Sequence, residues 1–177
     1  SIAESFERFA PVVVAASEAG LPVRGYVSCV SECPYDGPVD PGDVARVAAQ
    51  LYEMGCYEIS LGDTTGRATP ERIEAMLRAV RDVVPVQKLA GHYHDTGGRA
   101  LENIEASLAL GLRVFDAAVG GLGGCPYAPG AKGNVATEAV QDRLEALGFE
   151  TGLDRAVVAE AAEMARAMHG TQPREQG

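Results

Sequence analysis

Residues 57–96 read YEISLGDTTGRATPERIEAMLRAVRDVVPVQKLAGHYHDT and hold one full repeat of the pattern that decides the fold. An apolar run ends in a polar loop, an amphipathic helical segment follows, and a second apolar run ends at His94 and Asp95. Thr69 and Pro70 give the helix an N-cap residue and a proline at its first position. A strand, a helix and a second strand in this order predict a βαβ unit with parallel strands.

The same alternation extends outward on both sides of this unit, with strands recurring about every 30 residues, the length of one βα unit. We expect strands within residues 23–30, 57–66, 87–96 and 113–119. We expect helices over residues 5–20, 39–55, 69–84, 99–111, 136–147 and 154–168. The pattern therefore contains four successive βα units, the last of them completed by the helix 136–147, with one helix before the units and one after them.

Polar residues follow the predicted strands where each strand ends, at Asp63, His94, Asp95, Asp116 and the loop 125–134. In a βα barrel, chemistry is placed around this rim, whereas an open doubly wound sheet binds ligands at one switch point. Polar groups on several strands favour an α/β fold of the (β/α)8 TIM-barrel type. This chain would supply about the last four βα units plus C-terminal helices.

Composition limits the class of protein. The chain is 46% hydrophobic and 23% charged, which is typical of a globular domain, and no apolar run is long enough for a membrane span. A net charge of −10 argues against nucleic acid and anionic membranes as partners. The four cysteines form no CxxC pair, which favours a reducing compartment. We expect one domain over residues 1–169 and a polar tail over 170–177.

The start of the chain has no initiator methionine and no basic segment of the kind that opens a signal peptide. Its first residues already carry a helical pattern, so we expect the chain to be part of something longer.

His92 and His94 lie one residue apart on a predicted strand, so both side chains point to one face and Tyr93 points to the other. Two adjacent imidazoles suit a divalent metal ion. The alternative is a pair of core histidines, each hydrogen-bonded to backbone. Asp63, at the end of the preceding strand, is a plausible neighbour of the metal. A carboxylate that caps the turn after the strand is an equally good interpretation of Asp63.

The loop GGLGGCPYAPGAKGN, residues 120–134, is rich in glycine, so its backbone N–H groups can approach a ligand oxygen closely. Cys125 stands in its middle and could act as an acid, a base or a nucleophile, or be incidental. Asn134 precedes a helix, so a helix N-cap is its simpler interpretation. Tyr26 alternates with Ser28 on the first strand, which could point its hydroxyl inward.

Four stretches of the sequence, VRGYVSCVSECPY, MGCYEISLGDTTG, HYHDT and GLGGCPYAPGAKGN, resemble the 3-hydroxy-3-methylglutaryl-CoA lyase family. The last is the most specific, while the His-x-His strand is shared by a wider superfamily of metal-dependent TIM-barrel lyases. The resemblance runs from about residue 1 to about residue 168 and corresponds to the C-terminal half of the family's barrel. The Arg-Asp pair on the family's first strand, which supplies a metal-ligating aspartate and a substrate-contacting arginine, does not occur here.

The resemblance implies a role for each matching residue. His92 and His94 would ligate the metal through their imidazoles, and Asn134 through its side-chain oxygen. The implied catalytic residues are Cys125, Asp63 and His92, and the substrate-binding residues are Tyr26, Gly123, Gly124 and Lys132. Mg²⁺ or Mn²⁺ suits this oxygen-rich set better than Zn²⁺ or Fe²⁺.

The implied reaction is the retro-Claisen cleavage of an acyl-CoA substrate, 3-hydroxy-3-methylglutaryl-CoA, into acetyl-CoA and acetoacetate, as in leucine catabolism and ketone-body metabolism. The family suggests a homodimer, in the cytoplasm of a bacterium or in the mitochondrial matrix of a eukaryote. One alternative is a Claisen-type acyltransferase related to isopropylmalate or homocitrate synthase, which would share HYHD but not the glycine-rich loop. The other is a half barrel without activity.

Overall fold

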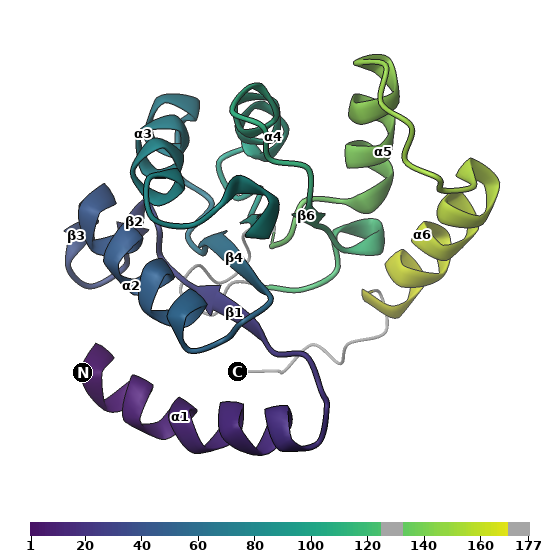
Figure 1. Cartoon of the computed structure of the whole chain (residues 1–177). Helices are drawn as coiled ribbons and strands as arrows, with labels where there is room; N and C mark the ends of the chain where they lie inside the picture. Colours follow the sequence, from purple (N-terminus) through teal and green to yellow (C-terminus); the bar gives the residue numbers. More distant parts are fainter. Residues whose placement is uncertain (125–132, 170–177) are drawn as a thin grey trace, which may run out of the picture.

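The computed structural model describes residues 1–124 and 133–169. Its centre is a four-stranded parallel sheet (Figure 1), in which the strand order equals the order along the chain. The strands are β1 (Arg24–Val27), β4 (Glu58–Asp63), β5 (Leu89–Tyr93) and β6 (Phe115–Asp116). Neighbouring strands that are also consecutive βα units are the arrangement of a βα barrel, so the predicted topology is confirmed for this part of the chain.

Helices cover one side of this sheet. Figure 1 shows α2, α3, α4 and α5 in an arc along it, with α1 below β1 and α6 beside α5. The α-helices are α1 (Ile2–Glu18), α2 (Pro41–Glu53), α3 (Pro70–Arg81), α4 (Ala100–Ala109), α5 (Thr137–Ala146) and α6 (Arg155–His169). Two single 3₁₀ turns, η1 (Val86–Lys88) and η2 (Val119–Gly121), complete the connections.

The predicted helix ends are largely confirmed. The carboxylate of Asp40 accepts a hydrogen bond from the Gly42 N–H, with Pro41 at the first position of α2. Gly20, at φ +68°, follows the end of α1. The interpretation of Asn134 as a helix N-cap is wrong, because α5 starts later and Ala136 is its N-cap residue.

The two faces of the sheet differ in polarity. The face toward the helices carries apolar side chains that no water reaches, among them Ile59, Leu61 and Leu89. These pack with the inner sides of α2, α3 and α4 in one continuous core. The other face carries Arg24, Glu58, Ser60, His92 and Asp116, which hydrogen-bond to one another across the strands. A polar inner face on a parallel sheet marks the side where chemistry can take place.

The strand predicted over residues 23–30 ends early, at Val27. Cys29 adopts φ +58°, a left-handed conformation that is rare for residues other than glycine and asparagine, and this turns the chain out of the sheet. Its N–H donates to the Thr64 hydroxyl at 3.0 Å. A short hairpin of β2 (Glu32–Cys33) and β3 (Gly37–Pro38), absent from the prediction, follows this turn.

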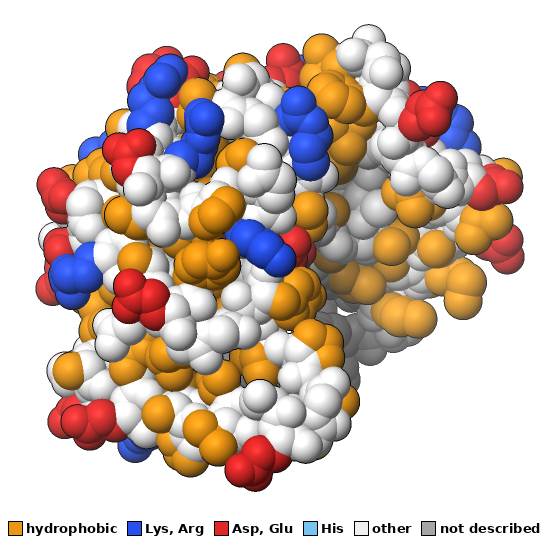
Figure 2. Space-filling model, in the orientation of Figure 1, with side chains coloured by type: hydrophobic (Ala, Val, Ile, Leu, Met, Phe, Trp, Pro, Cys, Tyr) orange, Lys and Arg blue, Asp and Glu red, His pale blue; other side chains and the backbone are white. Residues whose placement is uncertain are grey.

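Apolar side chains remain at the surface of the two outermost helices. In α1 they are Phe9, Val12 and Val14, and in α6 they are Val157, Met164 and Met168. Figure 2 shows orange surface along the bottom of the molecule and at the lower right, where these helices lie. Among the described residues, no helix combines the length and the apolar character that crossing a lipid bilayer requires.

Candidate metal centre and active site

His92 and His94 lie side by side on the polar side of the sheet. Their ring centroids are 5.4 Å apart and the ring planes are inclined by 50°. Tyr93 points the other way, where its hydroxyl lies 2.8 Å from the Ser107 Oγ of α4. The predicted placement of the two histidines on one face is therefore confirmed, although β5 itself ends at Tyr93 and His94 follows it.

The environment of His94 favours a neutral ring. Burial lowers the pKa of His94, and the neighbouring His92 lowers it further, while a hydrogen bond to the Thr64 backbone acts in the opposite direction. The Nδ1 atom of His94 is buried without a hydrogen-bond partner. A neutral imidazole with an unpartnered buried nitrogen is costly as core filling and well suited to a metal ion.

Asn134 reaches this pair through the backbone. His94 and Asn134 form an antiparallel β-bridge, and the Asp95 N–H donates to the Gly133 carbonyl at 2.8 Å. The Asn134 Nδ2 donates to the Leu122 carbonyl at 3.1 Å, which leaves the amide oxygen as the remaining acceptor of this side chain. Two segments 40 residues apart in sequence are thus brought to one place.

The donor set fits a divalent cation. Two imidazoles and one amide oxygen are ligand types that Mn²⁺ and related ions accept, and the orphaned nitrogen of His94 belongs to this set. Within residues 1–124 and 133–169, no group of three or more His, Cys, Asp or Glu side chains is arranged to hold a metal. A metal ion at this place would therefore need the amide of Asn134 and further oxygen donors in addition to the two imidazoles.

Asp116 ties His92 to the rest of the sheet. Its Oδ2 atom lies 2.9 Å from Arg24 Nη1, 2.9 Å from Ser60 Oγ and 3.2 Å from His92 Nδ1. Burial raises the pKa of Asp116, but the hydrogen bonds from Arg24, Ser60 and His92 and the charge of Arg24 outweigh it, so the net pKa is lowered. The carboxylate is therefore ionised at neutral pH.

Arg24 is fixed from two sides. Its Nε donates to Glu58 Oε1 at 2.6 Å while its Nη1 reaches Asp116, and it also donates to the Tyr26 hydroxyl. Burial lowers the pKa of Arg24, but its carboxylate partners raise it well beyond its ordinary value, so it stays charged. Arg24, Ser60, His92 and Asp116 come from four successive strands, one from each.

The sequence pattern predicts Asp116 only as a polar strand end and does not single out Arg24 or Ser60. The alternation of side chains within each strand is the signal that could have placed these residues on one face of the sheet. His92 and Asp116 are, in addition, register partners on neighbouring strands. Register between strands is a tertiary property, so the pairing itself could not be read from one strand alone.

Asp63 lies at the end of β4 and is fully buried. Its Oδ2 accepts the Ala68 N–H at 2.9 Å, and the Thr65 hydroxyl lies 3.4 Å from Oδ1. Burial raises the pKa of Asp63 against the lowering effect of the loop N–H groups. Its register partner is Tyr93, which points away from His92. These contacts agree with the turn-cap interpretation, and the catalytic role of Asp63 stays a prediction.

The predicted substrate-binding residues divide into two groups. The Tyr26 ring stands edge-on to His92, with centroids 6.3 Å apart, so it lies on the polar side of β1 as expected. Gly123 adopts φ +103°, and a side chain there would meet the Asn134 amide, while Gly124 has open space around it. Cys125 and Lys132 lie outside the described residues, so their predicted roles remain predictions.

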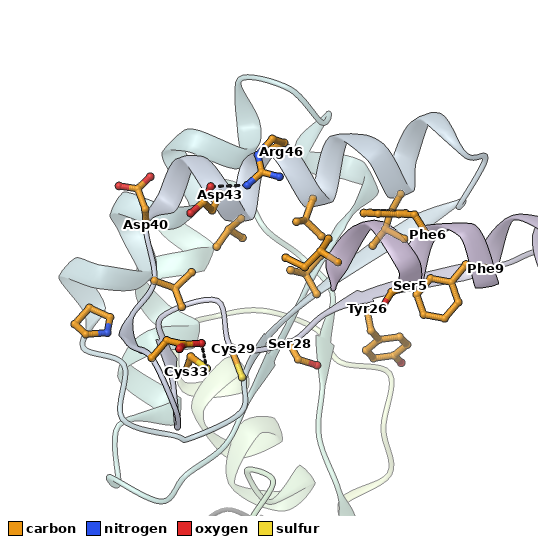
Figure 3. A pocket seen from close by; sticks show the side chains of 18 residues that line it. Ser5, Phe6, Phe9, Tyr26, Ser28, Cys29, Cys33, Asp40, Asp43 and Arg46 are labelled. Atoms are coloured by element: carbon orange, nitrogen blue, oxygen red, sulfur yellow. Dashed lines mark hydrogen bonds and ion pairs between the residues drawn. The ribbon is translucent and has the colours of Figure 1, made fainter.

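A groove of about 640 Å³ opens beside Tyr26, between α1 and α2 along the free edge of β1. Figure 3 shows Phe6 and Phe9 of α1 at one end of this groove and Cys29 and Cys33 at the other, with Tyr26 and Ser28 between them. The groove is mainly apolar and adjoins the polar face that carries His92.

A family profile described as HMGL-like matches residues 1–165. A hydroxymethylglutaryl-CoA lyase of Pseudomonas mevalonii is 54% identical over 171 residues, which is 97% of this chain and 57% of that protein. The chain therefore spans a little over half the length of this curated relative.

Solved structures of HMG-CoA lyases share the fold of this chain. An HMG-CoA lyase of Brucella melitensis superposes with a TM-score of 0.94 at 61% identity, over 96% of this chain and 60% of that one. An HMG-CoA lyase of Acinetobacter baumannii, solved with coenzyme A and 3-methylmalate, gives a TM-score of 0.87 at 33% identity, over 98% of this chain and 57% of that one. HMG-CoA lyase structures are TIM barrels, and the sheet described above is the corresponding part of such a barrel.

Proposed function

The chain belongs to the HMGL-like family, and from this premise we propose that it serves in a metal-dependent lyase that cleaves 3-hydroxy-3-methylglutaryl-CoA into acetyl-CoA and acetoacetate. The observation that carries the proposal is the β-bridge between His94 and Asn134, which pairs the backbone of Asn134 with that of one of two same-face histidines. Relatives at 54% identity that are named as this lyase support the reaction class.

His92, His94 and Asn134 would hold the cation, which we propose to be Mg²⁺ or Mn²⁺. A bound divalent cation supplies Lewis acidity toward the oxygens of the substrate and orients them. The histidines are suited to this because the lowered pKa of His94 keeps its ring neutral and able to ligate. Asn134 contributes oxygen without adding charge.

The reaction needs a base for the 3-hydroxyl proton as the new ketone forms. Asp63 and His92 are our two candidates. Burial raises the pKa of Asp63, which supports it as a proton acceptor, and His92 lies on the polar face itself. As the C2–C3 bond breaks, its electron pair passes to the thioester as an enolate. We propose that Cys125 then supplies the proton that turns this enolate into acetyl-CoA.

Tyr26, Gly123, Gly124 and Lys132 are the proposed substrate-binding residues. Gly124 is exposed, with open space where a Cβ would lie, and Lys132 would meet a CoA phosphate. The related lyase solved with coenzyme A supports an acyl-CoA substrate.

We further propose that the whole enzyme is a homodimer, cytoplasmic in a bacterium and in the mitochondrial matrix in a eukaryote.

Two assays on the full-length protein distinguish the lyase reaction from the acyltransferase reaction. The first assay offers 3-hydroxy-3-methylglutaryl-CoA and measures acetoacetate. The second offers acetyl-CoA with a 2-oxo acid and measures release of the CoA thiol, the product expected of a Claisen-type acyltransferase. We expect acetoacetate in the first assay and no thiol in the second. Thiol release without acetoacetate would replace the lyase by the acyltransferase, and inactivity in both would refute both reactions. The non-catalytic half barrel is tested with residues 1–177 alone, which it predicts to be inactive in both assays.

A further inference from the structure

We propose that Asp116 is a positioning residue that fixes the tautomer of His92, placing the proton on Nδ1 and leaving the Nε2 lone pair for a metal ion. The metal part of this inference rests on the proposed function. The tautomer is a property of the chain alone and can be measured without metal or substrate.

Three hydrogen-bonding groups meet at one oxygen of Asp116. Asp116 Oδ2 lies within 2.9 Å of both Arg24 Nη1 and Ser60 Oγ, and 3.2 Å from His92 Nδ1. A carboxylate paired with a guanidinium has no proton of its own to donate. A hydrogen bond between His92 and Asp116 therefore requires that Nδ1 carries the proton. In a neutral imidazole the other nitrogen, Nε2, then presents its lone pair. A His92 that gives this lone pair to a metal ion has none left to accept a proton, so this inference leaves Asp63 as the candidate for the base.

The sheet holds Asp116 in place for this purpose. His92 and Asp116 are register partners on β5 and β6, so their side chains leave the sheet on the same face. Arg24 is in turn held by Glu58 at 2.6 Å, and both side chains are less than one-fifth exposed. This chain of contacts runs across all four strands and ends on a single nitrogen of His92.

A carboxylate partner at Nδ1 distinguishes His92 from His94. In the described part of the chain, the Nδ1 of His94 has no hydrogen-bond partner, whereas the Nδ1 of His92 faces a carboxylate. A carboxylate behind a metal-ligating histidine fixes the ring orientation and raises its basicity, and its loss typically weakens metal binding by about 10–100-fold. Asp116 has the position that this role requires.

Ser60 provides a matched control. Its hydroxyl donates to the same oxygen of Asp116 but belongs to a different strand from His92. Ser60→Ala therefore removes one hydrogen bond from the network and keeps the carboxylate that faces His92. Asp116→Ala removes that carboxylate, and Asp116→Asn keeps an acceptor oxygen without the charge.

The first test is ¹⁵N NMR of the imidazole nitrogens in the metal-free, full-length wild-type protein, at an alkaline pH where the rings are neutral. The signals of His92 are assigned by their loss in His92→Asn. We expect a pyrrole-like Nδ1 and a pyridine-like Nε2 for His92. The opposite pattern would overturn the inference, and this measurement needs no folded Asp116 variant.

The second test compares Mn²⁺ affinity by electron paramagnetic resonance of the free ion. We expect Asp116→Ala to shift His92 toward the Nε2–H tautomer and to weaken Mn²⁺ binding by about 10–100-fold, while Ser60→Ala retains both. An Asp116→Ala protein with unchanged tautomer and affinity would overturn the inference. An inactive wild-type protein with the Nδ1–H tautomer would refute only the proposed function, and an active lyase with the Nε2–H tautomer would refute only this inference.

Discussion

The Nδ1 atom of His92 lies 3.2 Å from the Oδ2 atom of Asp116, and the two residues are direct register partners on β5 and β6. The candidate metal centre is thus built into the hydrogen-bond register of the sheet. Because both residues project from neighbouring strands, the position of His92 depends on the pairing of those strands as much as on its own rotamer.

Replacing Asn134 tests whether its side-chain oxygen is a ligand. We expect Asn134→Ala to weaken Mn²⁺ binding at least about tenfold, because the donor set loses one of its three groups. Asn134→Asp is the conservative control, since it keeps an oxygen at the same place and adds a charge that favours a cation. Calorimetric titration with Mn²⁺ measures both. Equal affinity in Asn134→Ala and the wild type would remove Asn134 from the site.

Gly66 supports the site through its conformation. It adopts φ +64°, and an added Cβ would lie 2.9 Å from the His94 carbonyl oxygen and 2.8 Å from the Thr96 nitrogen. We expect Gly66→Ala to lower the free energy of unfolding by about 1–3 kcal/mol and to reduce Mn²⁺ affinity.

Gly98→Ala is the control for this effect. Gly98 has φ +70°, but nothing lies within 4 Å of an added Cβ, so the substitution adds backbone strain without crowding. Urea denaturation should show the larger loss for Gly66→Ala. Equal losses for the two variants would mean that contact with His94 is irrelevant.

Tyr93 lies on the opposite face from the histidines, so its hydroxyl should matter for stability alone. Tyr93→Phe removes the 2.8 Å hydrogen bond to Ser107 in the core and should cost about 0.5–1.5 kcal/mol of unfolding free energy. Thermal denaturation should show a melting temperature lower by a few degrees. Metal affinity and any lyase activity should stay at the wild-type level, and a selective loss of activity would place Tyr93 in the chemistry.

The buried thiol of Cys56 is expected to make the free energy of unfolding fall as the pH rises. It is buried among Gly25, Ile59 and Leu51, and burial raises the pKa of its thiol from the ordinary value of 9.0. At a pH between the unfolded and the folded pKa, the Cys56 thiol of the folded protein therefore still carries its proton, whereas the thiol of the unfolded chain has lost it. Its contribution to the free energy of unfolding is complete below the unfolded pKa and is lost as the pH rises through the folded pKa.

Cys56→Ala isolates this contribution. Between about pH 7 and about pH 10, the free energy of unfolding should fall more steeply in the wild type than in Cys56→Ala. Urea denaturation at both pH values measures the difference. Identical slopes would show that the thiol of the folded protein titrates as it does in the unfolded chain.

Much of the fold could be predicted because its signals are local. Asp40 and Pro41 define the start of α2, and Gly20 defines the end of α1. The early end of the first strand could not be predicted, since Cys29 at φ +58° is held by the tertiary contact with Thr64 rather than by its own preference.

The site could be predicted in part for the same reason. Alternation along one strand places His92 and His94 together and Tyr93 opposite. The partners of His92 depend on strand register, so Arg24 and Ser60 become visible only when four strands are aligned. Asp63 remains a prediction as a catalytic group, and its observed partners are the N–H of Ala68 and the hydroxyl of Thr65.

We propose that His92, His94 and Asn134 hold a cation on which cleavage of 3-hydroxy-3-methylglutaryl-CoA depends. The most direct measurement is acetoacetate release by the full-length protein after removal of metals with EDTA and stepwise addition of Mn²⁺. We expect no release without metal and a return of activity in proportion to bound Mn²⁺, with His94→Ala recovering neither binding nor activity. Full-rate release by the metal-free protein would contradict the account.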